Sequence, residues 1–264
     1  MRRKWSRISF SAAGLLSVLV GCVSPRQGER GVLLLTFDDP NYDRWVEAMP
    51  LFAKYGAHAS FFPSQDLTDH ALVQLKRLKE GGHTVGIHTV NHADARAMFT
   101  QGLGADYIAK EVRPQLEAYG KIAHTVRAMA YPNNRHCPES DAALGRVCGI
   151  RRFRAGHVVR YDPEGRLPKP DLVNVDEVFF PVSELSEKKV LEGIGIGEAY
   201  QTDIEEIISC VNRAADRDEV LVMFSHDISA GATGVNMKTE WLTRILETAH
   251  KRNMRVIGFD EIDE

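Results

Sequence analysis

The sequence predicts an α/β fold in which parallel strands form a distorted (β/α) barrel of seven or eight strands, in a single domain. Apolar strand segments alternate with amphipathic helical segments, which is typical of parallel sheets. The length of 264 residues suits a barrel better than a sandwich. The 44% hydrophobic and 26% charged residues are ordinary for one globular domain with a sizeable core.

The first predicted strand is an apolar run that ends in two adjacent carboxylates. The run Val32–Pro40 carries Asp38 and Asp39 just before a turn. A short apolar run of this kind indicates a buried parallel strand. Chemistry in such folds takes place at the carboxyl ends of the strands. Two adjacent carboxylates repel each other and are costly to bury, so a site that keeps both usually offers one of them a cation, here most simply a metal ion.

The next elements alternate regularly as far as residue 147. Further strands are expected at His58–Phe62, Thr84–Ile87 and Thr125–Tyr131. Helices are expected at Trp45–Tyr55, Asp69–Glu80, Ala105–Tyr119 and Ser140–Val147. Pro114 is expected to kink the third of these helices.

Residues 151–197 are interrupted by prolines and predict long loops around two short strands, Arg152–Arg154 and Glu177–Phe180. The glycines of residues 193–197 have the wrong spacing for a dinucleotide fingerprint and indicate a loop. Regular elements return after residue 201. They are a helix at Thr202–Ala215, a strand at Val220–Ser225, a helix at Lys238–Lys251 and a strand at Arg255–Phe259.

The N-terminus predicts a bacterial lipoprotein signal peptide over residues 1–21, with cleavage before Cys22 and lipid on that cysteine. A basic segment precedes an apolar stretch over residues 8–20, and Gly21 lies directly before the cysteine. The alternatives are an ordinary signal peptide or an uncleaved anchor, which is too short to span a bilayer comfortably. Residues 22–30 then form a tether and residues 31–264 the domain. The chain is expected at the bacterial cell envelope, in the periplasm or at the surface.

The charge of the chain argues against nucleic-acid binding, and the spacing of its cysteines argues against a disulfide. The formal net charge is −3, and removal of four basic leader residues from the 33 present leaves 29 against 36 acidic ones, near −7. No basic tract predicts nucleic-acid binding. Beyond the leader lie Cys137, Cys148 and Cys210. A helix between the first two holds them roughly 16 Å apart, beyond disulfide reach, so no bridge is predicted.

Two histidines four residues apart are the best candidate metal ligands. His88 and His92 follow the predicted strand that ends at Ile87, and this spacing places both imidazoles on one side of a helical turn. One carboxylate and two neutral imidazoles leave coordination positions open. The pattern therefore favours a catalytic zinc-type site over a closed structural one.

Three motifs together resemble those of the polysaccharide deacetylases, the NodB-homology family, also called carbohydrate esterase family 4. They occur in the family's order over nearly all of the chain after the leader. The motifs are Thr36-Phe37-Asp38-Asp39, His88-Thr89-Val90-Asn91-His92 and Leu221-Val222-Met223-Phe224-Ser225-His226. The resemblance implies a distorted barrel that binds a divalent metal and hydrolyses acetyl groups on a glycan.

The resemblance also implies roles for five residues. Asp39, His88 and His92 would bind the metal, with zinc the first expectation and cobalt or nickel possible. Asp38 would be the general base that takes a proton from water. His226 would be the general acid that protonates the leaving group, a task that suits a histidine because its ordinary pKa lies near neutral pH.

The third family motif is altered. The usual arginine, which pairs with the base, is replaced by Ala130, and Asn133 stands at the position of an aromatic residue. The backbone N–H of Asn133 can still face the oxyanion, and Tyr131 is expected near the substrate. Arg127 lies three residues before Ala130, on the opposite face of the strand, and is a poor substitute. Arg154, on the next predicted strand, is the candidate partner that orients Asp38.

Two further departures lie near the expected site. No aspartate pair followed by tryptophan, the fourth family motif, is present, and Asp176 is the candidate residue to tune His226. Pro40 follows Asp39 where the family usually has glycine. These changes bear on the substrate more than on the type of reaction.

The expected function is metal-dependent N-deacetylation of a cell-envelope or environmental glycan. The first alternative is an O-acetyl polysaccharide esterase, or a hydrolase of a small linear amide, that uses the same metal site. The second is a non-catalytic, glycan-binding lipoprotein, which the altered third motif favours and the intact carboxylates and histidines oppose. The sugar, the linkage and the oligomeric state are not predicted.

Overall fold

The computed structural model describes residues 28, 30–157 and 171–263. The predicted signal peptide, Cys22 and most of the predicted tether lie outside the described residues, as do Pro163, Pro168 and Pro170 of the predicted loop region. Within the described part of the chain, no helix has the length and hydropathy needed to cross a bilayer.

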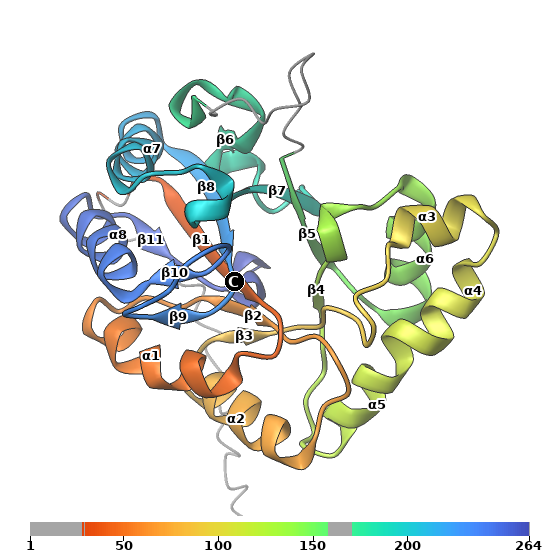
Figure 1. Cartoon of the computed structure of the whole chain (residues 1–264). Helices are drawn as coiled ribbons and strands as arrows, with labels where there is room; N and C mark the ends of the chain where they lie inside the picture. The colour runs from red at the N-terminus through yellow and green to blue at the C-terminus, as the bar shows by residue number, and fades with distance from the viewer. Residues whose placement is uncertain (1–27, 29, 158–170, 264) are drawn as a thin grey trace, which may run out of the picture.

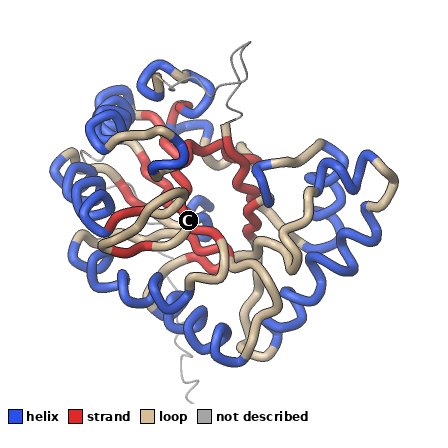
Figure 2. The backbone as a smooth tube through the Cα atoms, in the orientation of Figure 1, coloured by secondary structure: helices blue, strands red, loops and turns tan. Residues whose placement is uncertain are grey.

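Seven parallel strands surround the centre of the molecule, with the long helices packed outside them (Figures 1 and 2). Their order is β3-β2-β1-β8-β7-β5-β4, and Ile87 bridges to Met129 to connect the two ends of the sheet. These strands are β1 (Val32–Asp38), β2 (Ser60–Phe62), β3 (Thr84–Val85), β4 (Ala128–Ala130), β5 (Arg152–Gly156), β7 (Val190–Gly195) and β8 (Glu219–Ser225). The predicted distorted barrel is confirmed, nearly closed and in one domain.

Helices connect most of the successive barrel strands and cover the outer face of the barrel (Figure 1), whereas the described residues between β5 and β7 form only short 3-10 helices and one short strand. The helices are α1 (Tyr42–Lys54), α2 (Asp69–Glu80), α3 (Ala95–Thr100), α4 (Gly104–Tyr107), α5 (Arg113–Gly120), α6 (Pro138–Cys148), α7 (Ile204–Arg217) and α8 (Thr239–Lys251). A π-helical turn, Ile108–Val112, joins α4 to α5 just before Pro114. The expected kink in this helix therefore takes the form of a π-bulge.

Two hydrophobic clusters follow from strand alternation, since successive side chains face opposite sides of the sheet. On β1, Leu33 and Leu35 face the outer helices, whereas Val32 and Leu34 face the barrel interior. The C-terminal segment fills the interior at the amino-terminal end of the strands. There β11 (Arg255–Val256) pairs with the start of β1, and the short helix Phe259–Asp263 follows it.

The C-terminal helix packs into the barrel interior and closes the end at which the strands begin. Phe259 and Ile262 are at most 9% exposed and belong to the interior cluster. Backbone N–H groups of this segment also bind barrel side chains, with Phe259 donating to Ser60 Oγ at 2.9 Å and Asp260 to Thr84 Oγ1 at 2.8 Å. The predicted strand Arg255–Phe259 is therefore shorter than expected, because its last residues turn inward to close the barrel.

The prediction of a loop around the glycines at 193–197 is wrong in part, because β7 occupies Val190–Gly195. A Cβ added to Gly193 would lie 3.2 Å from Val222, and one added to Gly195 would lie 2.6 Å from the ring of Tyr200. These two glycines leave space for the neighbouring side chains of Val222 and Tyr200. A strand therefore forms here although the sequence lacks the usual run of β-branched residues. Three further short strands are β6 (Phe179–Pro181), β9 (Ile228–Ser229) and β10 (Met237–Lys238), and the last two pair with each other.

Acid should destabilise this fold partly through His83, which is 3% exposed. Its Nδ1 accepts a hydrogen bond from the Ala59 N–H at 3.1 Å, and burial beside His58 lowers its pKa to about 4. Between pH 6.5 and 4 the unfolded chain therefore binds a proton that the native chain does not, so stability falls as pH falls. The loss from this group is at most about 3 kcal/mol.

We expect the free energy of unfolding of His83→Asn to depend less on pH across this range, because asparagine accepts the same hydrogen bond and does not titrate. Urea unfolding at pH 7 and pH 4.5 measures the difference. His250→Asn, at an exposed position on α8, is the control. Equal pH dependence in His83→Asn and the wild type would contradict the prediction.

Candidate active site

Carboxylates and imidazoles converge where the strands of one side of the barrel end. Asp38 ends β1 and Asp39 follows it, His88 and His92 follow β3, and His226 directly follows β8. Because β1, β2, β3 and β8 are parallel and adjacent, their carboxyl ends meet at one rim of the barrel. The structure thus brings together the five residues predicted to perform the chemistry.

The end of β1 turns both carboxylates toward the site. Asp38 continues the inward alternation of Val32 and Leu34 and is 3% exposed. Asp39 leaves the strand with a positive φ of 74°, and its N–H donates to the Phe62 carbonyl at 3.2 Å. Ser64 Oγ donates to Asp39 Oδ1 at 3.1 Å and orients this carboxylate. The left-handed turn overcomes the alternation that would otherwise separate the two side chains.

The expected helical turn between His88 and His92 is wrong, because residues 88–92 form a loop. Thr89 and His92 have positive φ angles of 68° and 55°, which fold the loop back on itself. The two imidazole rings still meet, with centroids 4.9 Å apart. The i to i+4 spacing therefore indicated the right pair of residues through a different local geometry.

Two buried side chains on the neighbouring helix hold this loop. Glu111, in the π-helical turn, accepts hydrogen bonds from the backbone N–H of Asn91 at 2.7 Å and from the Asn91 side chain at 2.9 Å. Gln115 Nε2 donates to the Thr89 carbonyl at 3.2 Å, and its Oε1 accepts from the His88 N–H. The extra residue of the π-bulge lies beside this functional loop, where such bulges are common.

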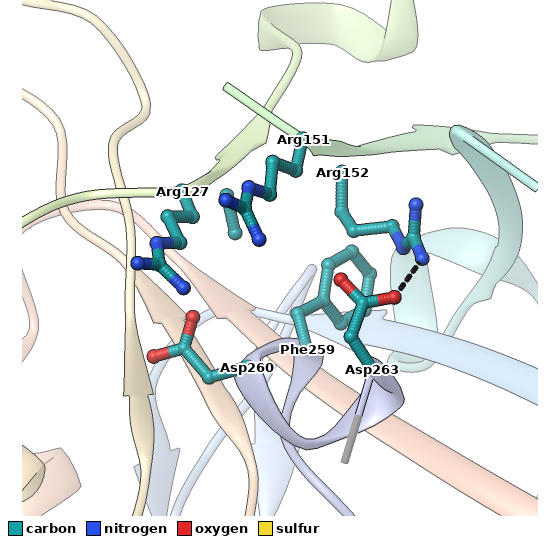
Figure 3. Close-up of a pocket in the computed structure, with 7 residues that line it drawn as sticks. Arg127, Arg151, Arg152, Phe259, Asp260 and Asp263 are labelled. Atoms are coloured by element: carbon teal, nitrogen blue, oxygen red, sulfur yellow. Dashed lines mark hydrogen bonds and ion pairs between the residues drawn. The ribbon is translucent and has the colours of Figure 1, made fainter. Parts of the chain in front are cut away.

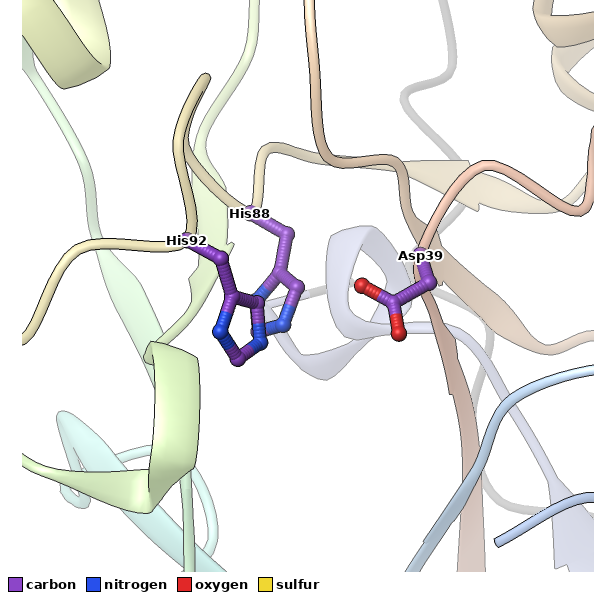
Figure 4. Close-up of side chains that lie close together, drawn as sticks. All are labelled: Asp39, His88 and His92. Carbon is purple, nitrogen blue, oxygen red and sulfur yellow. The ribbon is translucent and has the colours of Figure 1, made fainter.

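Asp39, His88 and His92 form a cluster that suits a divalent metal. One ligand atom from each lies within 4.8 Å of the other two (Figure 4). His88 Nδ1 donates to the Ala130 carbonyl at 2.8 Å, which leaves Nε2 with its lone pair free. Burial is the main cause that lowers the pKa of His88 to about 4, so the ring is neutral at pH 7. Two imidazole nitrogens and one carboxylate are a donor set typical of catalytic zinc sites.

Glu111→Gln should weaken metal binding about 10- to 100-fold, a typical cost of losing a group that orients a metal ligand. The glutamine amide turns a donor toward one of the two Asn91 donors, so the loop that carries both histidines loses a hydrogen bond. Competition with a chromophoric zinc chelator measures the dissociation constant. Glu117→Gln, on the exposed face of α5, is the matched control. Unchanged zinc affinity in Glu111→Gln would show that the loop holds its shape without this contact.

A buried ion pair holds Asp38. Arg154 of β5 donates to Asp38 Oδ2, and its other terminal nitrogen donates to Asn134 Oδ1. Burial alone would raise the pKa of Asp38, but Arg154, His88 and His226 together outweigh burial and lower it. The second oxygen, Asp38 Oδ1, has no hydrogen-bond partner among the described residues. Asp38 is therefore an ionised carboxylate with one oxygen free to accept a proton.

The register of the barrel explains why Arg154 can occupy this place. Ala130 of β4 and Arg154 of β5 are directly paired neighbours in the parallel ladder, so their side chains share the inward face. Alanine at position 130 leaves space there, and the Arg154 guanidinium packs 4.7 Å from the ring of Phe224. The arginine absent from one strand is present on the next at the same level. Arg127 is exposed, outside this site.

His226 faces the metal cluster from β8. Its Nε2 lies 3.7 Å from Asp39 Oδ2, and its Nδ1 lies 3.1 Å from the Val235 carbonyl, to which an Nδ1–H can donate. Trp45 Nε1 donates to the backbone carbonyl of His226 at 2.9 Å and fixes the turn. The Val235 backbone carbonyl thus orients the His226 imidazole, a role that was expected of the Asp176 side chain.

The expectation that Asp176 tunes His226 is wrong. Asp176 is paired with Arg213 Nη2 at 2.7 Å, and its side chain is 83% exposed. The same arginine binds Glu219 at the start of β8, whereas His226 follows the other end of that strand. Asp176 lies in a short helical turn before β6, and β6 pairs with the first residues of β8 and not with the end that His226 follows.

Tyr131 and Asn133 were both expected near the oxyanion, but the first is buried in the core and the second is exposed. Tyr131 is fully buried, its ring stacks on Phe153, and its hydroxyl donates to Asp141 at 2.7 Å, so its side chain belongs to the core and not to the site. Asn133 is exposed in a short turn after β4, with a positive φ of 53°. Its neighbour Asn134 is the residue that contacts Arg154. The substrate role predicted for the Tyr131 side chain is therefore wrong.

Tyr200 is a site residue that the sequence analysis missed. It follows β7, its ring lies over Gly195, and its centroid is 5.3 Å from that of Phe224. Burial raises its pKa, with further increases from Asp38 and Asp39. The hydroxyl therefore stays protonated beside the two carboxylates. Alternating glycines before an aromatic residue were the available signal, and they indicate a strand that makes room for a ring.

Comparison with known proteins adds two kinds of similarity. The family model described as polysaccharide deacetylase matches residues 26–147. A curated protein named chitin deacetylase, from Arthroderma benhamiae, is 36% identical over 80 residues, which are 29% of this chain and 21% of that protein. The matched stretch thus spans about a fifth of the relative.

Solved structures share the fold over most of the chain. The Xyl-CE4 domain of a multidomain xylanase from the hindgut metagenome of Trinervitermes trinervoides is 16% identical, with 89% of this chain and 90% of that chain covered and a TM-score of 0.57. A family 4 acetyl xylan esterase from Clostridium thermocellum, in complex with a cobalt ion, is 17% identical, with 88% and 89% covered and a TM-score of 0.56. At these identities the similarity establishes the barrel fold alone.

Proposed function

Since the chain contains a polysaccharide deacetylase domain, we propose that it is a metal-dependent hydrolase that removes N-acetyl groups from a cell-envelope or environmental glycan. The observation that carries this proposal is one rim of the barrel. There the cluster of Asp39, His88 and His92 lies beside a buried, ion-paired Asp38 and an imidazole from the opposite side. A carboxylate base, a potential acid and a metal-type donor set are the parts that amide hydrolysis needs.

Each residue of the site has its own role in the proposed reaction. Asp39, His88 and His92 would hold a divalent metal, zinc first or cobalt or nickel, which supplies Lewis-acid stabilisation of developing negative charge. Asp38 accepts a proton from the attacking water through its free oxygen, and Arg154 keeps that carboxylate ionised beforehand. His226 Nε2 then donates a proton to the departing nitrogen. The Val235 carbonyl keeps the proton of Nδ1 in place, so the acid proton is the one on Nε2.

The backbone N–H of Asn133 is proposed as an oxyanion donor. It precedes Asn134, whose side chain is held by Arg154, so the turn after β4 is tied to the same ion pair as the base. Gly156 permits this arrangement, because a Cβ there would lie 2.3 Å from Asn134 Nδ2. A main-chain donor does not require the aromatic side chain that the resemblance leads one to expect at position 133.

Acetate release from a panel of N-acetylated and O-acetylated glycans tests the proposal. The full chain is assayed as purified, after chelation, and after return of zinc or cobalt. Release from N-acetyl glycans that is lost on chelation and restored by metal is the expected result. Release from acetylated xylan alone would identify an O-acetyl esterase. Glycan binding with no release from any member would favour a non-catalytic binding protein.

We further propose that the chain is a bacterial lipoprotein anchored through Cys22. The basic segment, the apolar stretch and the small residue before the cysteine support this proposal. Labelling of the expressed protein with a radioactive fatty acid, and its loss in Cys22→Ser, is the expected result. Secretion of an unlabelled wild-type protein would identify an ordinary signal peptide instead.

A further inference from the structure

A second polar pocket lies at the end of the barrel opposite the metal cluster. It has a volume of about 180 Å³ and lies between the starts of β4 and β5 and the C-terminal helix (Figure 3). Arg127 and Arg151 come directly before these strands, and Arg152 begins β5. Since all the barrel strands are parallel, these positions are at the amino ends, whereas the proposed reaction takes place at the carboxyl ends. The pocket is therefore separate from the proposed active site.

The arginines of this pocket exceed the carboxylates available to them. Arg152 is paired with Asp263, and Asp260 is already bound by Lys79 at 2.8 Å. Among the described residues, no carboxylate forms an ion pair with Arg127 or Arg151. Both pocket carboxylates thus have other cations, and two guanidinium groups remain at the pocket without an anion.

Arg152 also presents a buried donor without a partner. Its side chain is only 10% exposed. Its Nη2 binds Asp263 and donates to the Ser186 carbonyl at 2.9 Å, but its Nε has no hydrogen-bond acceptor within the described part of the chain. An unsatisfied buried donor costs about 1–3 kcal/mol, and more when the group is charged. A ligand oxygen would remove this cost.

The arginines are held in a fixed arrangement by the backbone. The N–H groups of Arg151 and Arg152 both donate to the Arg127 carbonyl, at 2.7 and 3.2 Å. The three guanidinium groups therefore start from adjacent points on two hydrogen-bonded segments. Guanidinium groups match phosphate oxygens in geometry and charge and often bind them through paired hydrogen bonds. The volume is below the roughly 300 Å³ at which typical small-molecule pockets begin, so it suits one anionic group.

We propose that this pocket binds a phosphate group through Arg127, Arg151 and Arg152. The source is either the head group of an anionic lipid or a soluble phosphate compound, which share the same recognition chemistry. The site does not depend on the proposed deacetylation, and its ligand is not the acetylated substrate.

Titration of the full chain with inorganic phosphate, followed by calorimetry, tests the site. Arg127→Ser/Arg151→Ser removes the two exposed pocket cations, and Arg77→Ser/Arg146→Ser removes two exposed cations of α2 and α6 as a charge-matched control. We expect saturable binding that weakens at least tenfold in the pocket variant and less than twofold in the control. Arg152→Lys, with its charge kept but no Nε donor, should weaken binding as well. Absence of saturable binding, or an equal loss in the control, would overturn the proposal.

Vesicles distinguish the two sources. The wild type and both double variants are sedimented with phosphatidylglycerol vesicles and with phosphatidylcholine vesicles, so that any contribution of the N-terminal leader is common to all samples. Loss of phosphatidylglycerol binding in the pocket variant alone supports a lipid head group. Equal vesicle binding in all three proteins, together with loss of inorganic phosphate binding in the pocket variant, supports a soluble phosphate compound.

Discussion

Asp38→Asn should lower kcat/KM for acetyl release by about 10³-fold while the chain still binds metal. A general base typically contributes 10²- to 10⁴-fold, and an asparagine amide cannot accept the proton. Asp38 is not one of the three residues whose ligand atoms form the metal cluster, and its Oδ2 is 3.9 Å from His88 Nε2. Zinc affinity should therefore change much less than activity.

The measurement combines acetate release with zinc affinity on the same preparation. Asn at position 38 leaves the buried Arg154 without its counter-charge, so the thermal midpoint is recorded to show that the assayed protein is folded. Asp43→Asn, which alters an exposed carboxylate of α1 bound to His70, is the control for a nearby charge change. Activity within tenfold of wild type in a folded, metal-binding Asp38→Asn protein would contradict the role of Asp38 as the base.

Arg154→Ala should have the second large effect, on both stability and the pH profile. Removal of one partner of a buried ion pair typically costs about 3–5 kcal/mol. Arg154 and Asp38 have side chains that are 1% and 4% exposed, so solvent screens them little. The native pKa of Asp38 is lowered, which stabilises the fold at pH values above its ordinary pKa, and this contribution is lost as pH falls through the native pKa.

Without Arg154 the pKa of Asp38 should rise, so the acid limb of the activity profile should move to higher pH. Ala130→Arg/Arg154→Ala tests the explanation from strand register, because position 130 is the paired neighbour on β4. We expect the double variant to recover at least tenfold of the activity lost in Arg154→Ala and to shift the acid limb back. Arg152 lies two residues before Arg154 on β5 and faces the same side of the sheet. Arg152→Ala is therefore the comparison for loss of a buried arginine that does not contact Asp38. An unshifted acid limb in Arg154→Ala would contradict the assignment.

The sequence was sufficient to predict the barrel and the residues of its functional rim. Apolar runs that end in polar residues mark strands and their carboxyl ends, and three motifs resemble those of the polysaccharide deacetylases. Pattern and resemblance together placed Asp38, Asp39, His88, His92 and His226 at one site before any geometry was known. The arginine partner could be proposed because β4 and β5 are consecutive in the chain. Their register, which puts Arg154 level with Ala130, required the folded sheet.

The errors come from interactions that local patterns do not contain. The histidine loop depends on two left-handed residues and on Glu111 and Gln115, which lie 20 and 26 residues after the loop residues that they bind. Tyr200 could be found only with β7 recognised, and the glycines that hid that strand are explained by the ring that packs on them. Asp176 was misplaced because chain order does not say at which end of a strand a loop lies.

The inward turn of the C-terminal helix has a consequence for the kinetics of folding. β1 is the first barrel strand in the chain, and it pairs with β8 and with β11, whose residues come about 190 and 220 positions later. Phe259 and Ile262, which complete the barrel interior, come later still. Folding rates fall as contacting residues become more distant in sequence. The barrel should therefore close slowly, and only after the residues of the C-terminal helix have been synthesised.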